Sequence, residues 1–404
     1  MTVQRMTRRE FIVEVGLKAA GAGLMLNELQ ALPANAGEQP TQEKAKGSPP
    51  MAYRPLGKTG LMVSTVSFGV MRLQEPAVLF KAIDLGINYF DTAHVYQNGN
   101  NEILLGKVAK EYGRTRIFIA SKAQPFKLWK EVPDKLRDMA KKTLDQSLEE
   151  SLKRLQTDYL DVFFIHSVDD KSWPLNEEIL AFIEKIKKQG KARFAGISIH
   201  EPDCYVEVID QVLKSPLYDV ILASLNFKSP PEHGEVLKKA RKAGLGIIAM
   251  KTQAGGYQSA STPSVSPHQA ALTWVLEKDY VDCAIPGMVN MEQLAENTAA
   301  AGKKLSWSDR KVLSGYYHSV RDRYCTMCGA CSGTCSKGIR INTVNRALMY
   351  CEGYGDAALG RETYRELSSR VNALSCVGCS SQSCFCVNGI QIAQRMKRAH
   401  NLFA

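Results

Sequence analysis

The segment YLDVFFIHS, residues 159–167, is an almost unbroken apolar run that ends in His166. Runs of this kind are typical of strands in parallel sheets, which helices cover on both faces. Seven other short runs resemble it: VSTVSFGV (63–70), INYFDTA (87–93), IFIASKA (117–123), ARFAGISIH (192–200), DVILASLN (219–226), GIIAMKT (246–252) and CAIPGM (283–288). Amphipathic helical patterns such as NEILLGKVAKEYG (101–113) separate them, so strand and helix alternate along the chain.

Eight strand–helix units predict an α/β fold, a closed (β/α)8 TIM barrel, which we place at residues 52–305. An open doubly wound sheet is the alternative. It is disfavoured because no G-x-G-x-x-G motif follows the first strand, where dinucleotide-binding sheets of that class carry one.

Polar side chains stand where successive predicted strands end. Asp91 follows INYF, Lys122 follows IFIAS, His166 follows VFFI and Ser198 follows AGI, while Tyr96 lies in the loop just beyond Asp91. The C-terminal strand ends of a (β/α)8 barrel surround its active site, so these side chains are expected at one mouth. Any one of these residues could be an ordinary hydrogen-bonded polar side chain at a strand end. This explanation does not fit well when all of them are considered together.

Five segments resemble the aldo-keto reductases: FDTAHVYQNGNNEILLG (90–106), IFIASK (117–122), DYLDVFFIH (158–166), GKARFAGIS (190–198) and AIPGMVNMEQLAEN (284–297). The resemblance implies a barrel that binds NAD or NADP without a Rossmann fold. It also implies a catalytic tetrad of Asp91, Tyr96, Lys122 and His166.

These residue types suit hydride transfer between a nicotinamide ring and a carbonyl or alcohol. The carbonyl oxygen becomes an alkoxide, which needs a proton and a positive field. By resemblance, Tyr96 donates the proton. Lys122, placed by Asp91, is expected to lower the Tyr96 pKa from its ordinary value of about 10. His166 is expected to hydrogen-bond the carbonyl oxygen.

Cofactor-binding residues are predicted in the later strand ends and loops, and these are Ser198, Asn226, Lys251, Pro286, Gly287, Glu296 and Asn297. Some family positions differ. Ile199 replaces an Asn that holds the nicotinamide amide, and Leu222 replaces a Gln. Gly287, Met288 and Gln293 stand where NADP-dependent members carry Lys, Ser and Arg for the 2′-phosphate. Such a phosphate would lack charge-assisted partners here, so no preference for NADP is expected.

The last 80 residues hold nine of the eleven cysteines, in an internal repeat. CTMCGACSGTCSKGIRI from Cys325 aligns with CVGCSSQSCFCVNGIQI from Cys376 at an offset of 51. The first copy has the C-x2-C-x2-C-x3-C spacing of bacterial ferredoxins. Zinc is the first alternative, but zinc sites favour separated C-x-x-C pairs. Disulfides are the second, but cysteines this close are hard to pair without strain.

The tail, residues 306–404, therefore resembles a small α-helical two-cluster ferredoxin domain. The resemblance implies two 4Fe–4S clusters. One would be held by Cys325, Cys328, Cys331 and Cys386, and the other by Cys335, Cys376, Cys379 and Cys384. Cys384 is assigned because Gln382 stands where a ligand is expected, and a three-iron second cluster is the alternative. Cys204, Cys283 and Cys351 are interpreted as buried small apolar residues.

The N-terminus resembles a twin-arginine export signal. Arg8 and Arg9 in TRREFI (7–12) precede a weakly apolar run, and ANA (34–36) is a small-x-small cleavage pattern. This implies export of a folded protein to the periplasm or cell envelope, with cleavage after Ala36 and a polar linker over 37–51. An amphipathic N-terminal helix is the alternative.

The formal net charge is +11, but the Lys and Arg residues are dispersed over helical segments, which is typical of solvated faces. No basic–aromatic repeat indicates nucleic-acid binding, and no apolar run reaches the roughly 20 residues of a membrane span.

Two function classes remain. The first is an exported oxidoreductase with a small carbonyl or alcohol substrate. The second is a redox-sensing or electron-transfer protein that keeps the barrel as a cofactor-gated scaffold. A hydride carries two electrons, clusters pass them singly, and the sequence shows no flavin motif. The clusters are therefore predicted to be structural or to serve a redox partner protein.

Overall fold

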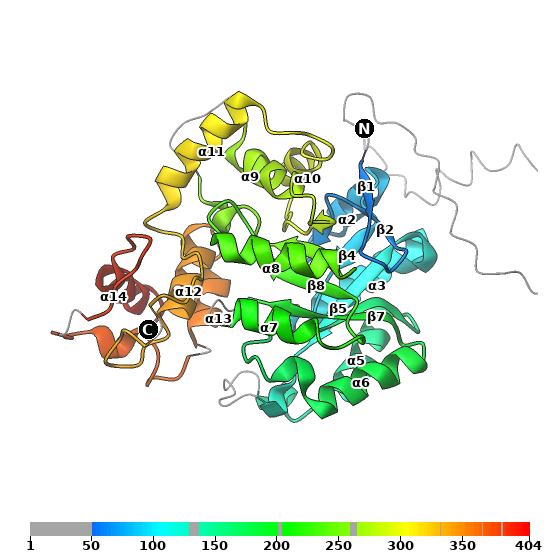
Figure 1. Cartoon of the computed structure of the whole chain (residues 1–404), viewed down its shortest axis with the longest axis horizontal. Coiled ribbons are helices and arrows are strands. Elements are labelled where there is room, and N and C mark those ends of the chain that lie inside the picture. The colour runs from blue at the N-terminus through cyan, green and yellow to red at the C-terminus, as the bar shows by residue number, and fades with distance from the viewer. Residues whose placement is uncertain are drawn as a thin grey trace, which may run out of the picture. The chain divides into compact units, whose positions relative to one another are not determined.

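The computed structural model describes residues 51–128, 137–200, 204–258, 265–331, 333–365, 367–380 and 383–404 (Figure 1). The predicted export signal, nearly all of the linker and Gln382 lie outside these ranges. The barrel and the tail both belong to the compact unit that ends at Ala404. None of the helices in the described ranges is long and apolar enough to cross a membrane.

Eight parallel strands form the central sheet, in the order β10 to β3. Parallel bridges from Val66 to Ala284 and from Gly69 to Gly287 join the two edges, which confirms the predicted barrel. The strands are β3 (Phe68–Gly69), β4 (Tyr89–Asp91), β5 (Phe118–Ala123), β6 (Leu160–Ile165), β7 (Ala192–Ile199), β8 (Val220–Ser224), β9 (Gly246–Met250) and β10 (Cys283–Ala284).

A helix follows each strand and covers the outside of the barrel. Side-chain caps fix where several helices begin: Thr143 and Gln146 form a capping box at α5, and Asn176 accepts two backbone N–H groups at α6. The covering helices are α2 (Pro76–Asp84), α3 (Asn100–Tyr112), α5 (Leu144–Leu155), α6 (Glu177–Lys188), α7 (Tyr205–Val212), α8 (Pro231–Lys242), α9 (Pro267–Leu276) and α10 (Met291–Thr298), with the short α4 (Arg137–Ala140) before α5.

The side-chain alternation along the strands divides the core into two clusters. On β6, Val162 and Phe164 belong to the cluster inside the barrel, whereas Phe163 and Ile165 belong to the cluster between strands and helices. Both sets are buried, which explains why this strand reads as one apolar run.

The first predicted strand, residues 63–70, is two strands rather than one. β2 (Met62–Ser64) pairs antiparallel with β1 (Tyr53–Pro55), and only β3 joins the barrel. Leu56 and Val63 of this hairpin enter the interior cluster. A Cβ on Gly246, the first residue of β9, would lie 2.7 Å from Leu56 Cδ1. The hairpin thus closes the N-terminal end of the barrel, so the site must open at the other end.

The tail is helical where the structure describes it. Its helices are α11 (Trp307–Val320), α12 (Ile341–Glu352), α13 (Ala357–Arg365) and α14 (Ile392–Phe403), with a 3-10 turn at Ala373–Cys376. Val344, Leu348 and Met396 lie in a core cluster of the tail. Tyr316 and Val320 of α11 pack in another cluster with barrel residues, so α11 attaches the tail to the barrel. The ferredoxin-like arrangement remains a prediction.

Candidate active site

A buried ion pair lies at the C-terminal ends of β4 and β5. Lys122 Nζ is 2.6 Å from Asp91 Oδ1, and the two side chains are 1% and 3% exposed. The same ammonium donates to the Thr92 carbonyl oxygen at 2.6 Å and reaches the Tyr96 hydroxyl at 3.4 Å. The structure therefore brings three of the four predicted tetrad residues into one hydrogen-bonded group.

Tyr96 is placed by the loop that follows β4. It begins a 3-10 turn, Tyr96–Gly99, in which Gln97 has a φ of 48°. The Gln97 amide donates to the carbonyl oxygens of Met71 and Leu73, which ties this loop to the loop after β3. These two hydrogen bonds hold the turn that carries the Tyr96 ring.

His166 completes the group. Its ring meets that of Tyr96 edge-on, with the centroids 5.8 Å apart and the planes at 83°. Burial lowers the pKa of His166 well below its ordinary value, and the charges of Lys122 and Arg346 lower it further. The imidazole is therefore neutral near pH 7. A neutral imidazole can still donate a hydrogen bond to a carbonyl oxygen without adding a full positive charge beside it.

The expected net lowering of the Tyr96 pKa does not occur. Burial raises the pKa of Tyr96, and although Lys122 acts to lower it as predicted, burial is the larger effect. Burial also lowers the pKa of Lys122, but Asp91 and Tyr96 together raise it above the ordinary value. Lys122 therefore stays an ammonium and Tyr96 stays a phenol, so the group presents a proton donor beside a fixed positive charge.

A cavity opens beside this group and receives most of the predicted cofactor residues. Lys251, Pro286, Gly287, Glu296 and Asn297 line it, together with Asp91, Tyr96 and Lys122. The structure therefore brings these five predicted positions to the same cavity as Asp91, Tyr96 and Lys122.

Ser198 and Asn226 have other contacts. Ser198 Oγ accepts the backbone N–H of Ser167, which directly follows His166 and has a φ of 54°. Ser198 thus holds the turn that positions the imidazole. The Asn226 amide donates to the Lys251 carbonyl oxygen and to the Tyr324 hydroxyl in the tail. Neither lines the cavity, and their cofactor roles remain predictions.

Several cavity residues were not among the predicted site residues, including His200 and Thr252. His200 follows β7, its ring lies 5.9 Å from that of His166, and burial lowers its pKa well below the ordinary value. Its position directly after a barrel strand was a usable signal. Thr252 follows β9, and its buried hydroxyl has no hydrogen-bond partner among the described residues.

The cavity wall lacks a cation at the positions that the family uses for a 2′-phosphate. Gly287 has no side chain there, Met288 is buried, and Gln293 accepts the backbone N–H of Val289 at 3.0 Å. Among the described lining residues, the cations are Arg72, Lys122 and Lys251.

The cysteines of the tail fall into two groups by their electrostatic neighbours. Burial raises the pKa of Cys325 to about 12, and the charges of Cys331, Cys328 and Cys386 add to this effect. Burial likewise raises the pKa of Cys376, with Cys384, Cys379 and Cys335 as its charged neighbours. These groups have the same members as the two predicted ligand sets.

No group of three or more His, Cys, Asp or Glu side chains in the described ranges is arranged so that it could hold a metal ion. The three remaining cysteines are interpreted as buried apolar residues, and the structure agrees with this in part. Cys204 and Cys283 are buried, and Cys351 is half-buried against the tail core.

The chain resembles known proteins both in sequence and in fold. YqkF of Bacillus subtilis (strain 168), an uncharacterized oxidoreductase, is 29% identical over 313 residues, which are 68% of this chain and 98% of YqkF. YrpG of the same organism, also an uncharacterized oxidoreductase, is 31% identical over 223 residues, 51% of this chain and 68% of YrpG. The holo form of the aldo-keto reductase AKR11C1 from Bacillus halodurans matches with a TM-score of 0.53 at 26% identity, over 65% of this chain and 95% of that one.

The Aldo/keto reductase family model matches residues 65–262. This range contains β3 to β9 and the four side chains that converge at the mouth. Together with the likeness to YrpG, this match means that the chain belongs to the aldo/keto reductase family and is an oxidoreductase.

Proposed function

We propose that the barrel transfers a hydride between a nicotinamide cofactor and a small carbonyl or alcohol substrate. The contact of Lys122 with both Asp91 and Tyr96, beside the ring of His166, is the observation that carries the proposal. Hydride reduction leaves negative charge on the carbonyl oxygen, and this group offers a proton and a positive charge at one place.

The residues of the cavity fit a dinucleotide. Lys251 offers a cation for a pyrophosphate, and the buried Thr252 hydroxyl offers an unused polar atom. Glu296 offers carboxylate oxygens as acceptors for an adenine amine, and Asn297, whose side-chain oxygen accepts from the Gln253 amide, lies beside it in the lining. When bound, the nicotinamide supplies or accepts the hydride.

Residues of this chain carry out the proton transfer. Tyr96 gives its hydroxyl proton to the carbonyl oxygen during reduction. Lys122 stabilises the resulting phenolate, and Asp91 keeps the ammonium in place. His166 donates a hydrogen bond to the same oxygen and so orients the carbonyl carbon toward the hydride.

Replacing Tyr96 with Phe tests this assignment. Tyr96→Phe should lower kcat for reduction of a neutral aldehyde by on the order of 10² or more, while cofactor binding stays close to that of the wild type. Tyr317→Phe, on the half-exposed ring of α11, is the matched control. A Tyr96→Phe enzyme within a few-fold of wild type would show that another group donates the proton.

We further propose that the tail holds two 4Fe–4S clusters, one for each cysteine group. Each thiolate of such a cluster binds a different iron, so the thiolates stand farther apart than ligands about 2.3 Å from a single zinc ion. The absence of a compact single-ion group in the described ranges is therefore compatible with clusters. The Asn388 amide also lies 3.8 Å from Cys328 Sγ, as a donor to that sulfur. Iron and sulfide analysis of anaerobically purified protein tests the assignment.

Clusters in this tail would connect the barrel to a redox partner protein or would serve only to stabilise the tail. Potentiometric titration separates the two roles, because only a redox-active cluster changes oxidation state within the range of biological potentials.

Export by the twin-arginine pathway is also a proposal, supported by Arg8 and Arg9 ahead of a weakly apolar run. The double variant Arg8→Lys/Arg9→Lys should accumulate in the cytoplasm on cell fractionation. Unchanged export of that variant would reject the proposal.

A further inference from the structure

The loop after β9, residues 251–256, has a strained backbone. Lys251 and Ala254 have φ values of 56° and 50°, a left-handed conformation that residues with a Cβ rarely adopt. Such a conformation persists only where the surrounding structure holds it. Four residues of this loop line the cavity, and these are Lys251, Thr252, Gln253 and Gly256. The contacts that hold the loop therefore also set the shape of the cavity.

The carbonyl oxygen of Lys251 is connected to the tail through Asn226. The Asn226 amide nitrogen donates to that oxygen at 3.0 Å and to the Tyr324 hydroxyl at 3.1 Å. The amide oxygen of Asn226 accepts the backbone N–H of Lys228 at 2.9 Å, which fixes the direction in which the amide faces. Tyr324 is 2% exposed and directly precedes Cys325. The chain that leads into the first cysteine group thus supports the start of the loop.

A second tail tyrosine holds the middle of the same loop. The Tyr316 hydroxyl, on α11, donates to the Gln253 carbonyl oxygen at 2.9 Å, and Tyr316 is 1% exposed. The Gln253 amide in turn donates to the side-chain oxygen of Asn297, on α10, at 2.6 Å. Gln253 and Asn297 both line the cavity. The Tyr316 hydroxyl therefore fixes the residue that joins the loop to α10.

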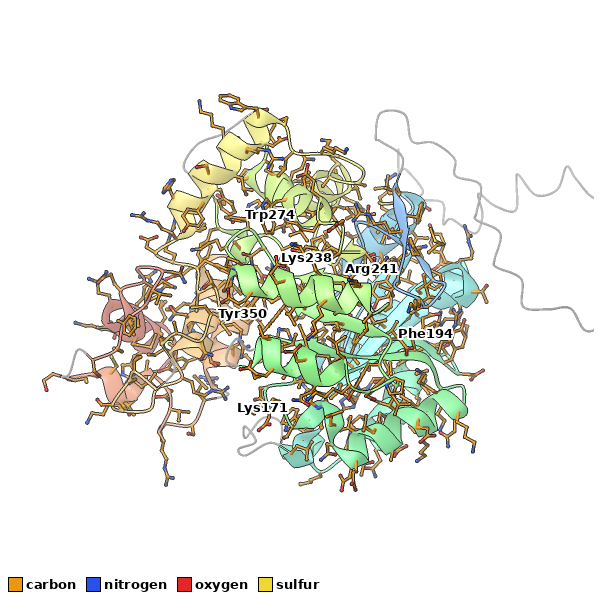
Figure 2. All side chains as sticks on the ribbon, in the orientation of Figure 1. Lys171, Phe194, Lys238, Arg241, Trp274 and Tyr350 are labelled. Atoms are coloured by element: carbon orange, nitrogen blue, oxygen red, sulfur yellow. The ribbon has the colours of Figure 1, made fainter. Side chains whose placement is uncertain are left out.

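The end of α12 packs against the last part of the loop. A Cβ on Gly353 would lie 2.2 Å from the Gly255 carbonyl oxygen, so the two backbones approach closely. Gly353 lines the cavity, as does Tyr350, which Figure 2 labels on the tail helix beside the barrel. In the loop after β3, Arg72 donates to the Tyr354 carbonyl oxygen at 2.9 Å. The tail is thus fastened to the loops after β3, β8 and β9.

The tail residues in these contacts lie outside residues 65–262, the range that the family model matches. The matched barrel supplies the loop but not all of the groups that hold it. We propose that Tyr316 and Tyr324 are positioning residues for the cofactor, because they hold the loop after β9 in the form that binds the dinucleotide. Neither tyrosine is among the described residues that line the cavity, so both act through the loop. This inference rests on the proposed hydride transfer and adds that its cofactor site depends on the tail.

Calorimetric titration of the full chain with NAD tests the inference. Tyr316→Phe and Tyr324→Phe each remove one hydroxyl and keep the ring. Each should raise the Kd of NAD by about 3-fold or more, and the double variant by about 10-fold or more. Binding of ADP-ribose should weaken in parallel, because it carries the pyrophosphate that the loop is proposed to hold. KM for the cofactor should rise while kcat at saturating cofactor changes less, because the tetrad lies outside this loop.

A double-mutant cycle separates positioning through the loop from a general loss of stability. Tyr324 acts through Asn226, so Tyr324→Phe should weaken NAD binding little further once Asn226→Ala is present. Tyr316→Phe should still weaken NAD binding in the Asn226→Ala background, because it acts on Gln253 by a separate hydrogen bond. Additive effects of Tyr324→Phe and Asn226→Ala would mean that Tyr324 does not act through this amide, which would overturn its assigned role.

Tyr364→Phe is the matched control. It removes another buried tyrosine hydroxyl of the tail, but the partner of that hydroxyl is the Ala373 N–H of the tail itself. It should leave the Kd of NAD unchanged. Wild-type affinity in the Tyr316→Phe/Tyr324→Phe variant would overturn the inference, as would an equal loss in Tyr364→Phe. If the wild type binds neither NAD nor NADP, the proposed hydride transfer itself fails.

Discussion

Lys228, in the loop after β8, directs its ammonium to the carbonyl oxygen of Tyr324, the residue immediately before the first tail cysteine. The Nζ–O distance is 3.5 Å, and the same nitrogen lies 5.8 Å from the centre of the Tyr324 ring. Burial lowers the pKa of Lys228 to about 8, while the charges of Cys325 and Cys386 act in the opposite direction. A barrel cation thus lies close to the cysteines of the proposed first cluster.

Removing this cation should lower the midpoint potential of the first cluster. Reduction adds negative charge, which a nearby ammonium stabilises, so Lys228→Met should shift the potential downward by tens of millivolts. Potentiometric titration followed by electron paramagnetic resonance measures the shift. Lys397→Met, on the exposed face of α14, is the charge-matched control. Equal potentials in wild type and Lys228→Met would mean that this lysine only fastens the tail.

The pH dependence of carbonyl reduction should be flat across the neutral range. Reduction needs a neutral His166, whose pKa lies well below 6.5, and a protonated Tyr96, whose pKa lies above 10.0. Activity is then lost only as pH falls below the lowered His166 pKa or rises above the raised Tyr96 pKa. The measurement is kcat/KM for a neutral aldehyde, with circular dichroism to confirm folding. A limb centred between pH 6.5 and 10.0 would contradict this assignment.

NADP should bind no more tightly than NAD. Gly287 and Gln293 stand where the family uses cations, and Gln293 is occupied with the backbone of Val289. Titration of both oxidised cofactors checks this expectation. Gln293→Arg should strengthen NADP binding relative to NAD, because it restores a charge-assisted partner. Wild-type NADP binding tighter by 10-fold, about 1.4 kcal/mol, would mean that another cation such as Lys251 holds the phosphate.

The barrel and the tetrad could be predicted because their signals are local. Each strand is a continuous apolar run, and each tetrad residue follows such a run or its loop. The run VSTVSFGV misled for the same reason. Its apolar residues Val63, Val66 and Phe68 continue on both sides of Thr65, although the chain there leaves the hairpin and enters the barrel.

Tyr350, Gly353 and Tyr354 of the tail line the cavity, and this part of its wall had no local signal in the sequence. Arg72 and Tyr354 are 282 residues apart in the chain, and their contact depends on how two whole units pack. Gly255 and Gly353 are ordinary loop glycines in the sequence, and only the packed structure shows that their backbones touch.

The second cysteine group allows a sharp test of its fourth ligand. Cys384 lies two residues beyond Gln382, the position expected from the first copy of the repeat. Burial raises the pKa of Cys384, and Cys335 and Cys379 are its charged neighbours. The Ser383 hydroxyl donates to the Thr334 carbonyl oxygen at 3.0 Å, which brings this run beside Cys335. These contacts favour Cys384 as the ligand that replaces the missing cysteine.

Iron content and spectroscopy decide the matter together. Anaerobically purified wild type should contain about eight irons per chain, as two 4Fe–4S clusters require, whereas a three-iron second cluster would give about seven. Cys384→Ser should change the paramagnetic signal of the second cluster and leave that of the first, because a hydroxyl is a much poorer iron ligand than a thiolate. Cys351→Ser, at a cysteine outside both groups, should change neither. A second-cluster signal that survives Cys384→Ser intact would show that Cys384 only packs nearby, which favours the three-iron alternative.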